Sequence, residues 1–150
     1  MRFFLGLIIL LVADQLSKYA VITNLELGEK YPVIDEWFTL TYIHNKGAAF
    51  GIMEGGYWFF VVAALLAVAG MIYYVARYKP HPFLEWVLGI IAGGALGNLI
   101  DRIFYQSVID FISIGWWPVF NLADVGITVG SVVLIFFILY SEKNEEVKNG

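Results

Sequence analysis

The sequence of 150 residues contains no cysteine, which excludes disulfides, thiol catalysis and cysteine-based metal sites. It has only two histidines, His44 and His81, and lacks the H-E-x-x-H pattern of zinc proteases, so metalloprotease chemistry has little support. Charged residues are also scarce, at 15% of the chain against about 25% in an average soluble domain. The net charge of −4 gives no indication of nucleic-acid binding.

The scarcity of charge leaves long apolar blocks, and hydrophobic residues make up 60% of the sequence. A helix needs about 20 residues to cross the roughly 30 Å of hydrocarbon in a bilayer. Four stretches qualify, at residues 3–22, 57–76, 83–104 and 121–140. They predict an all-α membrane bundle of four transmembrane helices, built as a single membrane domain over residues 1–150. Two long loops, 23–56 and 105–120, and a short connection, 77–82, join these stretches. We expect the tail, 141–150, to be solvated and frayed.

The first apolar stretch has to be distinguished from a cleavable signal peptide, because Arg2 precedes it. A signal peptide ends in a cleavage site of small residues. Polar and bulky residues occupy that place here: Asp14, Gln15, Ser17, Lys18 and Tyr19. We therefore expect an uncleaved first span.

Basic residues predict the direction of the bundle. Lys30 and Lys46 lie in the loop 23–56, whereas the basic residues near the other ends of the spans are Arg2, Arg77, Lys79, Lys143 and Lys148. By the positive-inside rule, both termini are cytoplasmic and the two long loops face outward.

A rise of 1.5 Å per helical residue places the polar residues of three spans at one depth. Asp14 lies beyond the middle of the first span, and Lys18 is one turn closer to the outer face. Asn98 and Arg102 come near the outer end of the third span, and Asp124 opens the fourth. Ionisable residues inside a membrane indicate function by default, so this gathering near the outer leaflet requires a reason.

Some of these residues also have structural interpretations. Asp14 and Lys18 are i,i+4 neighbours, which predicts either a structural ion pair or support of a nearby active site. Asn98 and Arg102 share a helical face, whereas Asp101 needs a partner from another segment. Three glycines recur every fourth residue of the third span and predict a flat face for close helix packing: Gly89, Gly93 and Gly97.

Asp110 and Asp124 are harder to explain by structure alone. Asp110 stands in a β-branched run, 108–114, which predicts a short strand without a local partner for the carboxylate. Asp124 follows Asn121 at the predicted start of the fourth helix, where helix capping is the competing explanation. Pro118 is expected to end the strand, and a loop that turns back there would bring the two aspartates together.

The first outer loop is longer than a connection requires, and such loops are often functional. Residues 37–44 alternate as in a strand, with Thr39 and Thr41 on one face. A turn at 45–47 follows, and residues 48–51 lead back to the membrane. We expect a small extracytoplasmic β-sheet on the outer surface.

A close pair of carboxylates supports hydrolysis, because one member keeps its proton while the other is ionised. The ionised member takes a proton from water as the water attacks a carbonyl, and the protonated member assists the carbonyl oxygen and the leaving amine. Serine chemistry has weaker support. A Ser–Lys dyad would combine Ser17 or Ser113 with Lys18. A Ser–His–Asp system would need His44 to reach a serine, and the nucleophile elbow is absent.

Five motifs follow one another along nearly the whole chain: Asp14-Gln15-x-x-Lys18, Asn45-Lys46-Gly47-Ala48-Ala49-Phe50-Gly51, Gly93-Gly94-Ala95-Leu96-Gly97-Asn98-Leu99-Ile100-Asp101-Arg102, Val108-Ile109-Asp110-Phe111 and Phe120-Asn121-Leu122-Ala123-Asp124. Each motif alone is weak. Together, in order on four predicted spans, they resemble the bacterial lipoprotein signal peptidases (signal peptidase II), a family of membrane aspartyl proteases.

The resemblance implies that Asp110 and Asp124 are the catalytic dyad. It also implies that other residues line or support the site: Asn45, Gly47, Asn98, Arg102, Asn121 and Ala123, with Asp14 and Lys18 behind them. The implied substrate is a prolipoprotein whose cysteine carries a diacylglyceryl group, cut just before that cysteine, with the outer sheet cradling the peptide. We expect no metal or other cofactor, no nucleic-acid partner, contact with membrane lipid and a monomeric protein. The expected location is the bacterial cytoplasmic membrane, with the active site near its outer face.

Two other classes of protein compete with this interpretation. A small transporter or proton-coupled channel would also bury Asp and Lys, but it favours charge near the midplane and internal repeats, and neither is evident. A non-catalytic assembly protein would use polar groups to lock helices together, which leaves Asp110 unexplained.

Overall fold

The computed structural model describes residues 1–47 and 56–149, with the side chains of these segments up to Ser141. In this part of the chain, four helices are long and apolar enough to cross a membrane, so the protein is a multi-pass membrane protein. The bounds of the first three lie close to the predicted spans. The helices are α1 Arg2–Asn24, α2 Tyr57–Tyr78, α3 Pro82–Tyr105 and α4 Leu122–Asn149.

Helix α4 continues beyond Leu122–Ser141, the part apolar enough to cross a membrane, and ends at Asn149. The expectation of a frayed tail over 141–150 is therefore wrong for the backbone up to Asn149. The tail is rich in Glu and Lys, which are good helix formers. Extending an existing helix also avoids the cost of nucleating a new one. The polarity of the tail carries no information against a helix.

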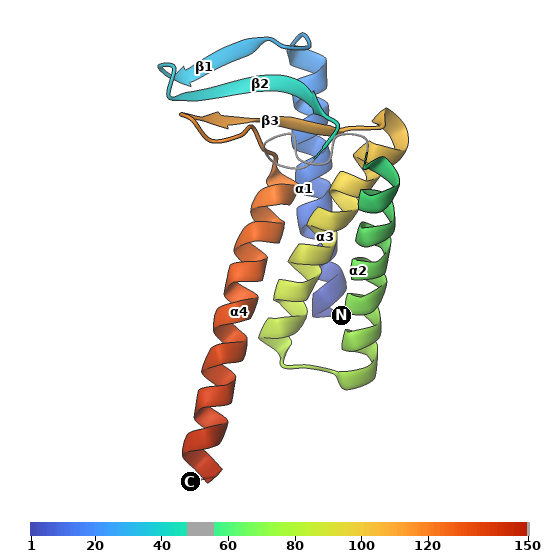
Figure 1. Ribbon diagram of the computed structural model, residues 1–150, viewed down its shortest axis with the longest axis vertical. Coiled ribbons are helices and arrows are strands. Elements are labelled where there is room, and N and C mark those ends of the chain that lie inside the picture. The colour runs from blue at the N-terminus through green and yellow to red at the C-terminus, as the bar shows by residue number, and fades with distance from the viewer. Residues whose placement is uncertain (48–55, 150) are drawn as a thin grey trace.

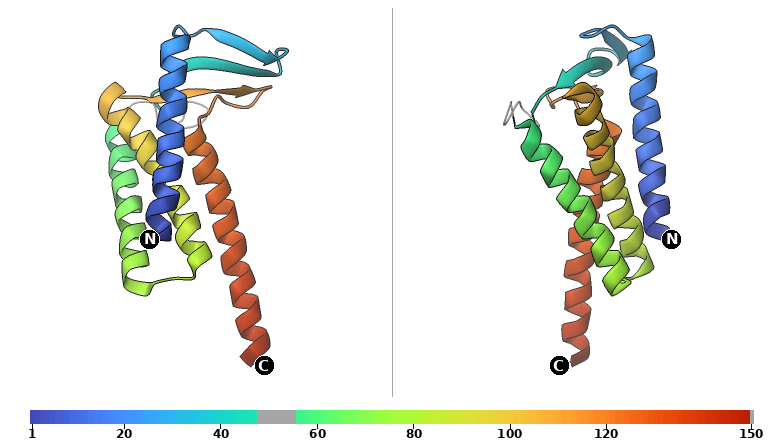
Figure 2. Two further views of the ribbon diagram at one scale, coloured as in Figure 1. Left: turned by 180° about the vertical axis from the view of Figure 1, so that it is seen from behind. Right: turned by 90° about the vertical axis from the view of Figure 1, so that its right-hand side faces the viewer.

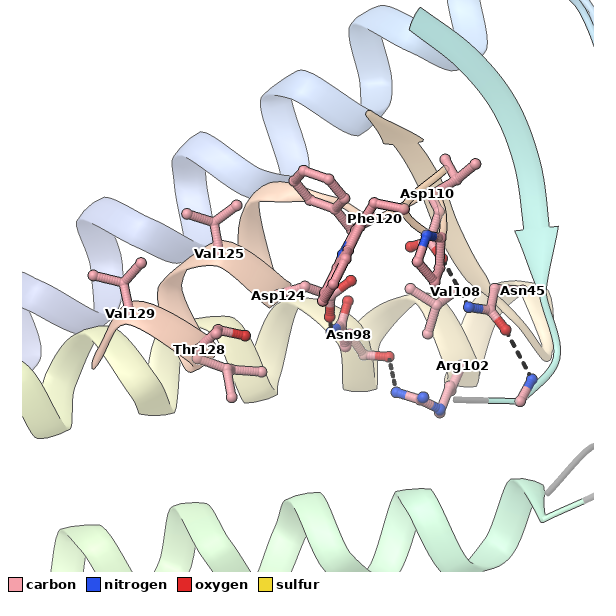
Figure 3. A pocket seen from close by; sticks show the side chains of 15 residues that line it. Asn45, Asn98, Arg102, Val108, Asp110, Phe120, Asp124, Val125, Thr128 and Val129 are labelled. Carbon is pink, nitrogen blue, oxygen red and sulfur yellow. Dashed lines mark hydrogen bonds between the residues drawn. The ribbon is translucent and has the colours of Figure 1, made fainter. Parts of the chain in front are cut away.

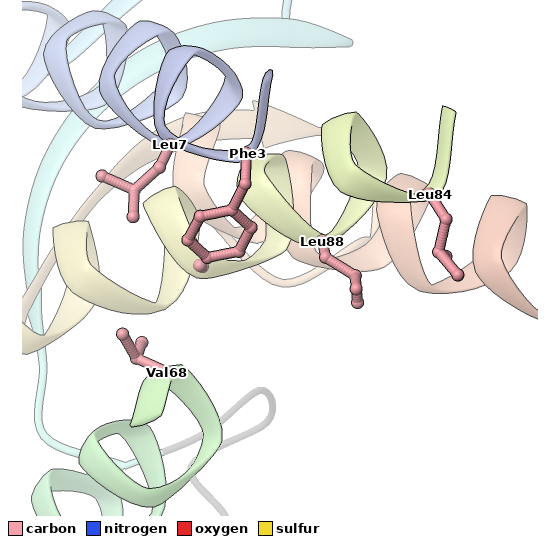
Figure 4. Packing of buried hydrophobic residues seen from close by; sticks show 6 residues of the cluster. Phe3, Leu7, Val68, Leu84 and Leu88 are labelled. Carbon is pink, nitrogen blue, oxygen red and sulfur yellow. The ribbon is translucent and has the colours of Figure 1, made fainter. Parts of the chain in front are cut away.

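Helix α3 packs against each of the other three helices and lies among them in Figures 1 and 2. Its predicted glycine face contacts α1, where a side chain on Gly89 or Gly93 would collide with the backbone of Phe3 or Leu7. The main chains can approach this closely only because no Cβ separates them. The buried apolar cluster of this region combines residues of α1, α2 and α3 (Figure 4): Phe3, Leu7, Val68, Leu84, Leu88 and Ala92.

A β-sheet lies across one end of the bundle, and both chain termini lie away from it (Figures 1 and 2). Within the described residues it has three antiparallel strands in the order β1-β2-β3, namely Lys30–Ile34, Phe38–Asn45 and Val108–Ile114. The sheet joins the two long loops that the sequence placed on one side of the membrane. This arrangement confirms the predicted fold class of a four-helix membrane bundle with a small sheet.

The central strand β2 confirms the alternation seen in the sequence. Thr39 and Thr41 are buried, at 8% and 2% exposure, and the Thr41 hydroxyl donates to the Glu29 carbonyl oxygen at 2.7 Å. The pairing of β2 with β3 shifts register between Leu40 and Ile43. The shift leaves one extra residue on β2, which bends the strand where it approaches the bundle.

The chain after β3 turns back on itself, as the sequence predicted. Phe120 N donates to the Ile112 carbonyl oxygen at 3.0 Å, and Ile112 N donates to the Phe120 oxygen at 2.8 Å. The strand ends at Ile114, next to Gly115, whose φ of 52° favours glycine. The strand therefore ends at Ile114, the last residue of the predicted run 108–114, before Pro118 is reached. The start of α4 is held directly beside the middle of β3.

Candidate active site

Asp124 takes part in the N-terminal cap of α4, which is the structural explanation that the sequence offered as an alternative to a catalytic role. Asp124 N donates to Asn121 Oδ1 at 2.9 Å, and Asn121 N faces Asp124 Oδ2 at 3.4 Å, so the two residues cap the start of α4 reciprocally. The cap does not account for the whole carboxylate. Asp124 Oδ1 accepts a hydrogen bond from Asn98 Nδ2 on α3 at 2.7 Å, and the side chain also lines a cavity.

Asp110 occupies the middle of β3 and is 1% exposed. Asn45 Nδ2, at the end of β2, donates to Asp110 Oδ2 at 2.8 Å, and Asn121 Nδ2 donates to Asp110 Oδ1 at 2.7 Å. Burial, followed by the nearby Asp124 carboxylate, raises the pKa of Asp110 to about 7, although both amide donors act in the opposite direction. Asp110 is therefore a carboxyl group that titrates near neutral pH.

Two asparagines connect the carboxylates. Asn121 Nδ2 donates to Asp110 and also to Asn98 Oδ1, at 3.1 Å, while Asn98 Nδ2 donates to Asp124. An amide carries an acceptor and two donors, so each asparagine can bind a carboxylate and its neighbouring amide together. The two aspartates are thus held in one network by side chains from α3 and α4.

Lys18 lies behind this network and is 2% exposed. Its ammonium group contacts Asp14 Oδ2 at 2.8 Å, Asp101 Oδ2 at 2.7 Å and Asn98 Oδ1 at 3.1 Å, so all three of its hydrogens have acceptors. For Asp101, Lys18 is thus the partner from another segment that the sequence required without identifying it. A buried charge in this position is tolerated because it is completely paired.

Asp14 connects α1 to the start of α4. Its Oδ1 accepts a hydrogen bond from Ala123 N at 2.9 Å, which satisfies one of the free amides of the first helical turn. Gly97 provides the space, since a Cβ on this glycine would collide with the Asp14 carboxylate. The last glycine of the predicted packing face therefore accommodates a charged side chain as well as a helix.

Arg102 is the charged residue of α3 closest to solvent among those at the site. Its Nη1 donates to the Asn98 carbonyl oxygen at 3.3 Å, and its guanidinium carbon lies 4.7 Å from the centre of the Phe60 ring on α2. The guanidinium also interacts electrostatically with Asp124, Asp101 and Asp110. Arg102 also lines the polar end of the cavity together with Asp110 and Asp124.

An open cavity of about 440 Å³ unites these groups (Figure 3). One end is polar and is lined by Asn45, Gly47, Asn98, Arg102, Asp110 and Asp124. The other end follows α4, where Val125, Thr128 and Val129 lie along the wall (Figure 3). The cavity can therefore receive a molecule with a polar reacting group and an apolar chain.

The structure brings all ten predicted site residues into one assembly. Six line the cavity, and four are buried behind it, namely Asp14, Lys18, Asn121 and Ala123. In the motif 45–51, residues 48–51 lie outside the described residues. Gln15 was not among the predicted site residues. Its Nε2 donates to Asp101 Oδ1 at 3.1 Å and to the Gly97 carbonyl oxygen at 3.3 Å, so it belongs to the same network. Its position next to Asp14 was the available signal.

The serine alternatives find little support in the geometry. His44 does reach a serine, since its Nδ1 lies 2.6 Å from Ser107 Oγ. However, Ser107 is 2% exposed, and its hydroxyl donates to the Tyr105 carbonyl oxygen at 3.1 Å. Ser17 donates to the Asp14 carbonyl oxygen at 2.8 Å, and Lys18 is occupied by its three acceptors. Within the described part of the chain, no group of three or more His, Asp or Glu side chains is arranged to hold a metal ion.

Fold and site together define a multi-pass membrane protein with two aspartates in an open, polar-ended cavity. The model of the family described as Signal peptidase (SPase) II matches residues 6–140. The chain belongs to this family.

Similar proteins and a solved structure support this family assignment. The chain is 45% identical over 146 residues to the lipoprotein signal peptidase of Syntrophomonas wolfei, covering 97% of this chain and 98% of the relative. It is 39% identical over 153 residues to that of Bacillus subtilis, covering 99% of each. A bacterial membrane enzyme whose structure was solved by the in meso method at 2.3 Å matches with a TM-score of 0.88 and 30% identity, covering 95% of this chain and 90% of the other.

Proposed function

We propose that this signal peptidase is an aspartyl endopeptidase that removes the signal peptide from diacylglyceryl-modified prolipoproteins, cutting just before the lipidated cysteine. Its family supports proteolytic removal of signal peptides from prolipoproteins. The observation that carries the aspartyl mechanism is the joint placement of Asp110 and Asp124. Both carboxylates line one cavity and are held by the linked amides of Asn98 and Asn121.

The proposed reaction uses one proton shared by the pair. The ionised aspartate removes a proton from a water molecule, and the resulting hydroxide attacks the carbonyl carbon of the scissile bond. The protonated aspartate donates to the carbonyl oxygen of the tetrahedral intermediate. The proton first taken from water then passes to the leaving amine as the C–N bond breaks. A hydroxyl of the intermediate returns its proton to the other aspartate, which forms the carboxylic acid product and restores the singly protonated pair. The raised pKa of Asp110, to about 7, supports Asp110 as the member that is protonated before attack.

The surrounding residues have positioning and binding roles in this proposal. Asn45 and Asn121 orient Asp110, and Asn98 orients Asp124. Arg102 and Gly47 line the polar end of the cavity, where the Arg102 guanidinium offers donors to the carbonyl groups of the substrate peptide. Asp14 and Lys18 hold α1, α3 and α4 in register through Ala123 N and Asn98 Oδ1. No step requires a metal or another cofactor.

The cavity also supports the class of substrate. Its polar end meets the peptide, while its wall along α4 is formed by Val125, Val129 and other apolar side chains suited to a signal peptide or an acyl chain. We further propose that the site lies near the outer leaflet of the bacterial cytoplasmic membrane, with both termini cytoplasmic. The working unit is a monomer in contact with lipid, without a nucleic-acid partner.

Replacement of either carboxylate by an amide tests the mechanism. Asp110→Asn and Asp124→Asn each remove the acid–base function while keeping the shape, so cleavage of a lipidated precursor should fall by more than about a thousandfold. The matched control is Asp35→Asn, in the exposed turn between β1 and β2. Asparagine accepts the positive φ of this position, so activity should be unchanged.

Two results would contradict the proposal. Cleavage by either active-site variant at a rate near that of the unmodified protein would exclude the dyad. Thermal unfolding in detergent shows whether an inactive variant is still folded. A loss of activity with EDTA that Mg²⁺ restores would show that the carboxylates act by holding a metal. We expect EDTA to leave the rate unchanged.

A further inference from the structure

A second chain of hydrogen bonds lies on the opposite face of β2 from Asn45 and outside the cavity. Tyr42 Oη lies 2.8 Å from His44 Nε2, and His44 Nδ1 lies 2.6 Å from Ser107 Oγ. The Ser107 hydroxyl donates to the Tyr105 carbonyl oxygen at 3.1 Å, and the Tyr105 ring meets the His44 ring edge to face, with centroids 6.0 Å apart. None of these four residues belongs to the five motifs that define the site.

The hydrogen count assigns one arrangement to this chain. Ser107 uses its hydrogen toward the Tyr105 oxygen, so it must accept from His44 Nδ1–H. His44 Nε2 is then the acceptor and receives the Tyr42 hydroxyl hydrogen. Burial raises the pKa of Tyr42, which keeps that hydrogen in place. The His44 tautomer with its hydrogen on Nδ1 therefore gives every member of the chain a partner.

The chain joins two segments that meet at the site. Ser107 follows Gln106, which ends α3 in the left-handed conformation with φ 56°, and precedes β3. His44 pairs with Ile109 of β3, and the register ends one residue later at Asn45 and Val108. Successive side chains of a strand point to opposite faces. His44 therefore binds the turn between α3 and β3 while Asn45 binds Asp110.

We propose that His44 and Ser107 form a positioning pair, which holds the end of β2 so that the Asn45 amide stays on Asp110. The backbone ladder alone ends at Asn45 and allows this last pair to fray. On its other side, Gly47 N donates to Asn45 Oδ1 at 3.0 Å, shortly before the described part of the chain breaks off at residue 47. The His44–Ser107 bond supplies a further restraint from the opposite face. This inference rests on the proposed catalytic role of Asp110.

The consequence is a change in how Asp110 titrates. Charged groups reach it from three helices: Asp124 on α4, Lys18 on α1 and Arg102 on α3. Asn45 adds a hydrogen bond that favours the ionised carboxylate and so lowers its pKa. Weakening that bond should raise the pKa at which the pair loses its second proton. The alkaline limb of the activity profile should then move to higher pH.

The test compares pH profiles of kcat/KM for a lipidated precursor. Asn45→Ala should move the alkaline limb upward by about one pH unit, and His44→Ala and Ser107→Ala each by about half a unit. The double variant should shift no further than either single one, because both changes remove the same bond. His44→Asn places an N–H donor where Nδ1 lay and should restore the original limb, whereas His44→Gln should not.

His81→Ala is the structural control, because His81 Nδ1 accepts from Phe83 N at the distant start of α3. It should lower the unfolding temperature and leave the limb in place. The inference is overturned if Asn45→Ala moves the limb but the His44 and Ser107 variants do not. It is equally overturned if the His44 and Ser107 shifts add in the double variant. Full activity of Asp110→Asn would instead remove the proposed function, so the two failures are distinguishable.

Discussion

The two carboxylates are held by the same kind of donor but in different settings. Asp124 is half-buried at the start of α4, where backbone and amide N–H groups converge on it. Asp110 is 1% exposed within strand β3, and its carboxylate accepts from the side-chain amides of Asn45 and Asn121. Burial, followed by the nearby Asp124 carboxylate, raises the pKa of Asp110 to about 7.

The first prediction concerns the pH dependence of the unmodified enzyme. The pKa of Asp110 is raised to about 7 by burial and by Asp124, so the pair carries one proton below this pH and loses it above. Since the reaction needs that proton, kcat/KM should fall as pH rises through about 7, approaching tenfold per pH unit. Rates on a lipidated precursor between pH 5 and 9 measure this limb. A rate that still increases at pH 9, with the fold intact by circular dichroism, would contradict the assignment.

Counting residues along the spans predicted which polar groups lie at one depth, because helical rise depends only on position. The contacts confirm that these groups meet. The choice of partners was not predictable. Lys18 forms an ion pair with Asp101 in addition to Asp14 because of how α1 and α3 are rotated about their axes. The spacing of residues within one helix does not determine that rotation. The dual use of the Asn98 amide depends on a side-chain rotamer for the same reason.

At the scale of the elements, the association of α1 with α3 depends on glycines, which have no side chain to separate the two helices. In a membrane, burial of apolar surface contributes little to helix association, and close packing of small residues becomes the main contribution. Gly93 shows this directly, since a Cβ placed on it would lie 2.5 Å from the Leu7 carbonyl oxygen. Backbone atoms cannot move aside as a flexible side chain can.

A pair of glycine substitutions tests this packing. Gly93→Ala should destabilise the protein by about 1–3 kcal/mol and reduce activity, because α1 must move away from α3 and carries Asp14 with it. Gly70→Ala on α2 is the matched control, since nothing lies within 4 Å of the added Cβ. This second change should be neutral or slightly stabilising. Thermal unfolding of both variants in the same detergent provides the measurement, and equal midpoints would contradict the role of the glycine face.

The sheet was predictable in part. Residues 108–114 and 37–44 carry β-branched runs or clear alternation, and both became strands. Strand β1, Lys30–Ile34, was not predicted, because every one of its residues is exposed. A strand without a buried face leaves no alternation in the sequence, and Pro32 argues further against one. It forms because β2 offers a free edge beside it.

At the scale of the whole molecule, the sheet and the two termini occupy opposite ends of the bundle (Figure 1). The sequence grouped these segments correctly, because an even number of crossings returns the chain to its starting side. The direction in the membrane depends instead on which end carries the basic residues. Direction decides which leaflet presents a lipid-anchored substrate to the cavity, so it is the remaining requirement for the proposed function.

The absence of native cysteine allows a direct test of direction. Single cysteines would be introduced as Glu36→Cys, exposed at the sheet, and as Gly150→Cys at the C-terminus. If the sheet faces outward, a membrane-impermeant maleimide should label Glu36→Cys in intact cells and Gly150→Cys only after the membrane is opened. The unmodified protein supplies the background, and retained cleavage of a precursor shows that each variant is correctly inserted. The reverse labelling pattern would place the cavity at the cytoplasmic leaflet and contradict the proposed location of the site.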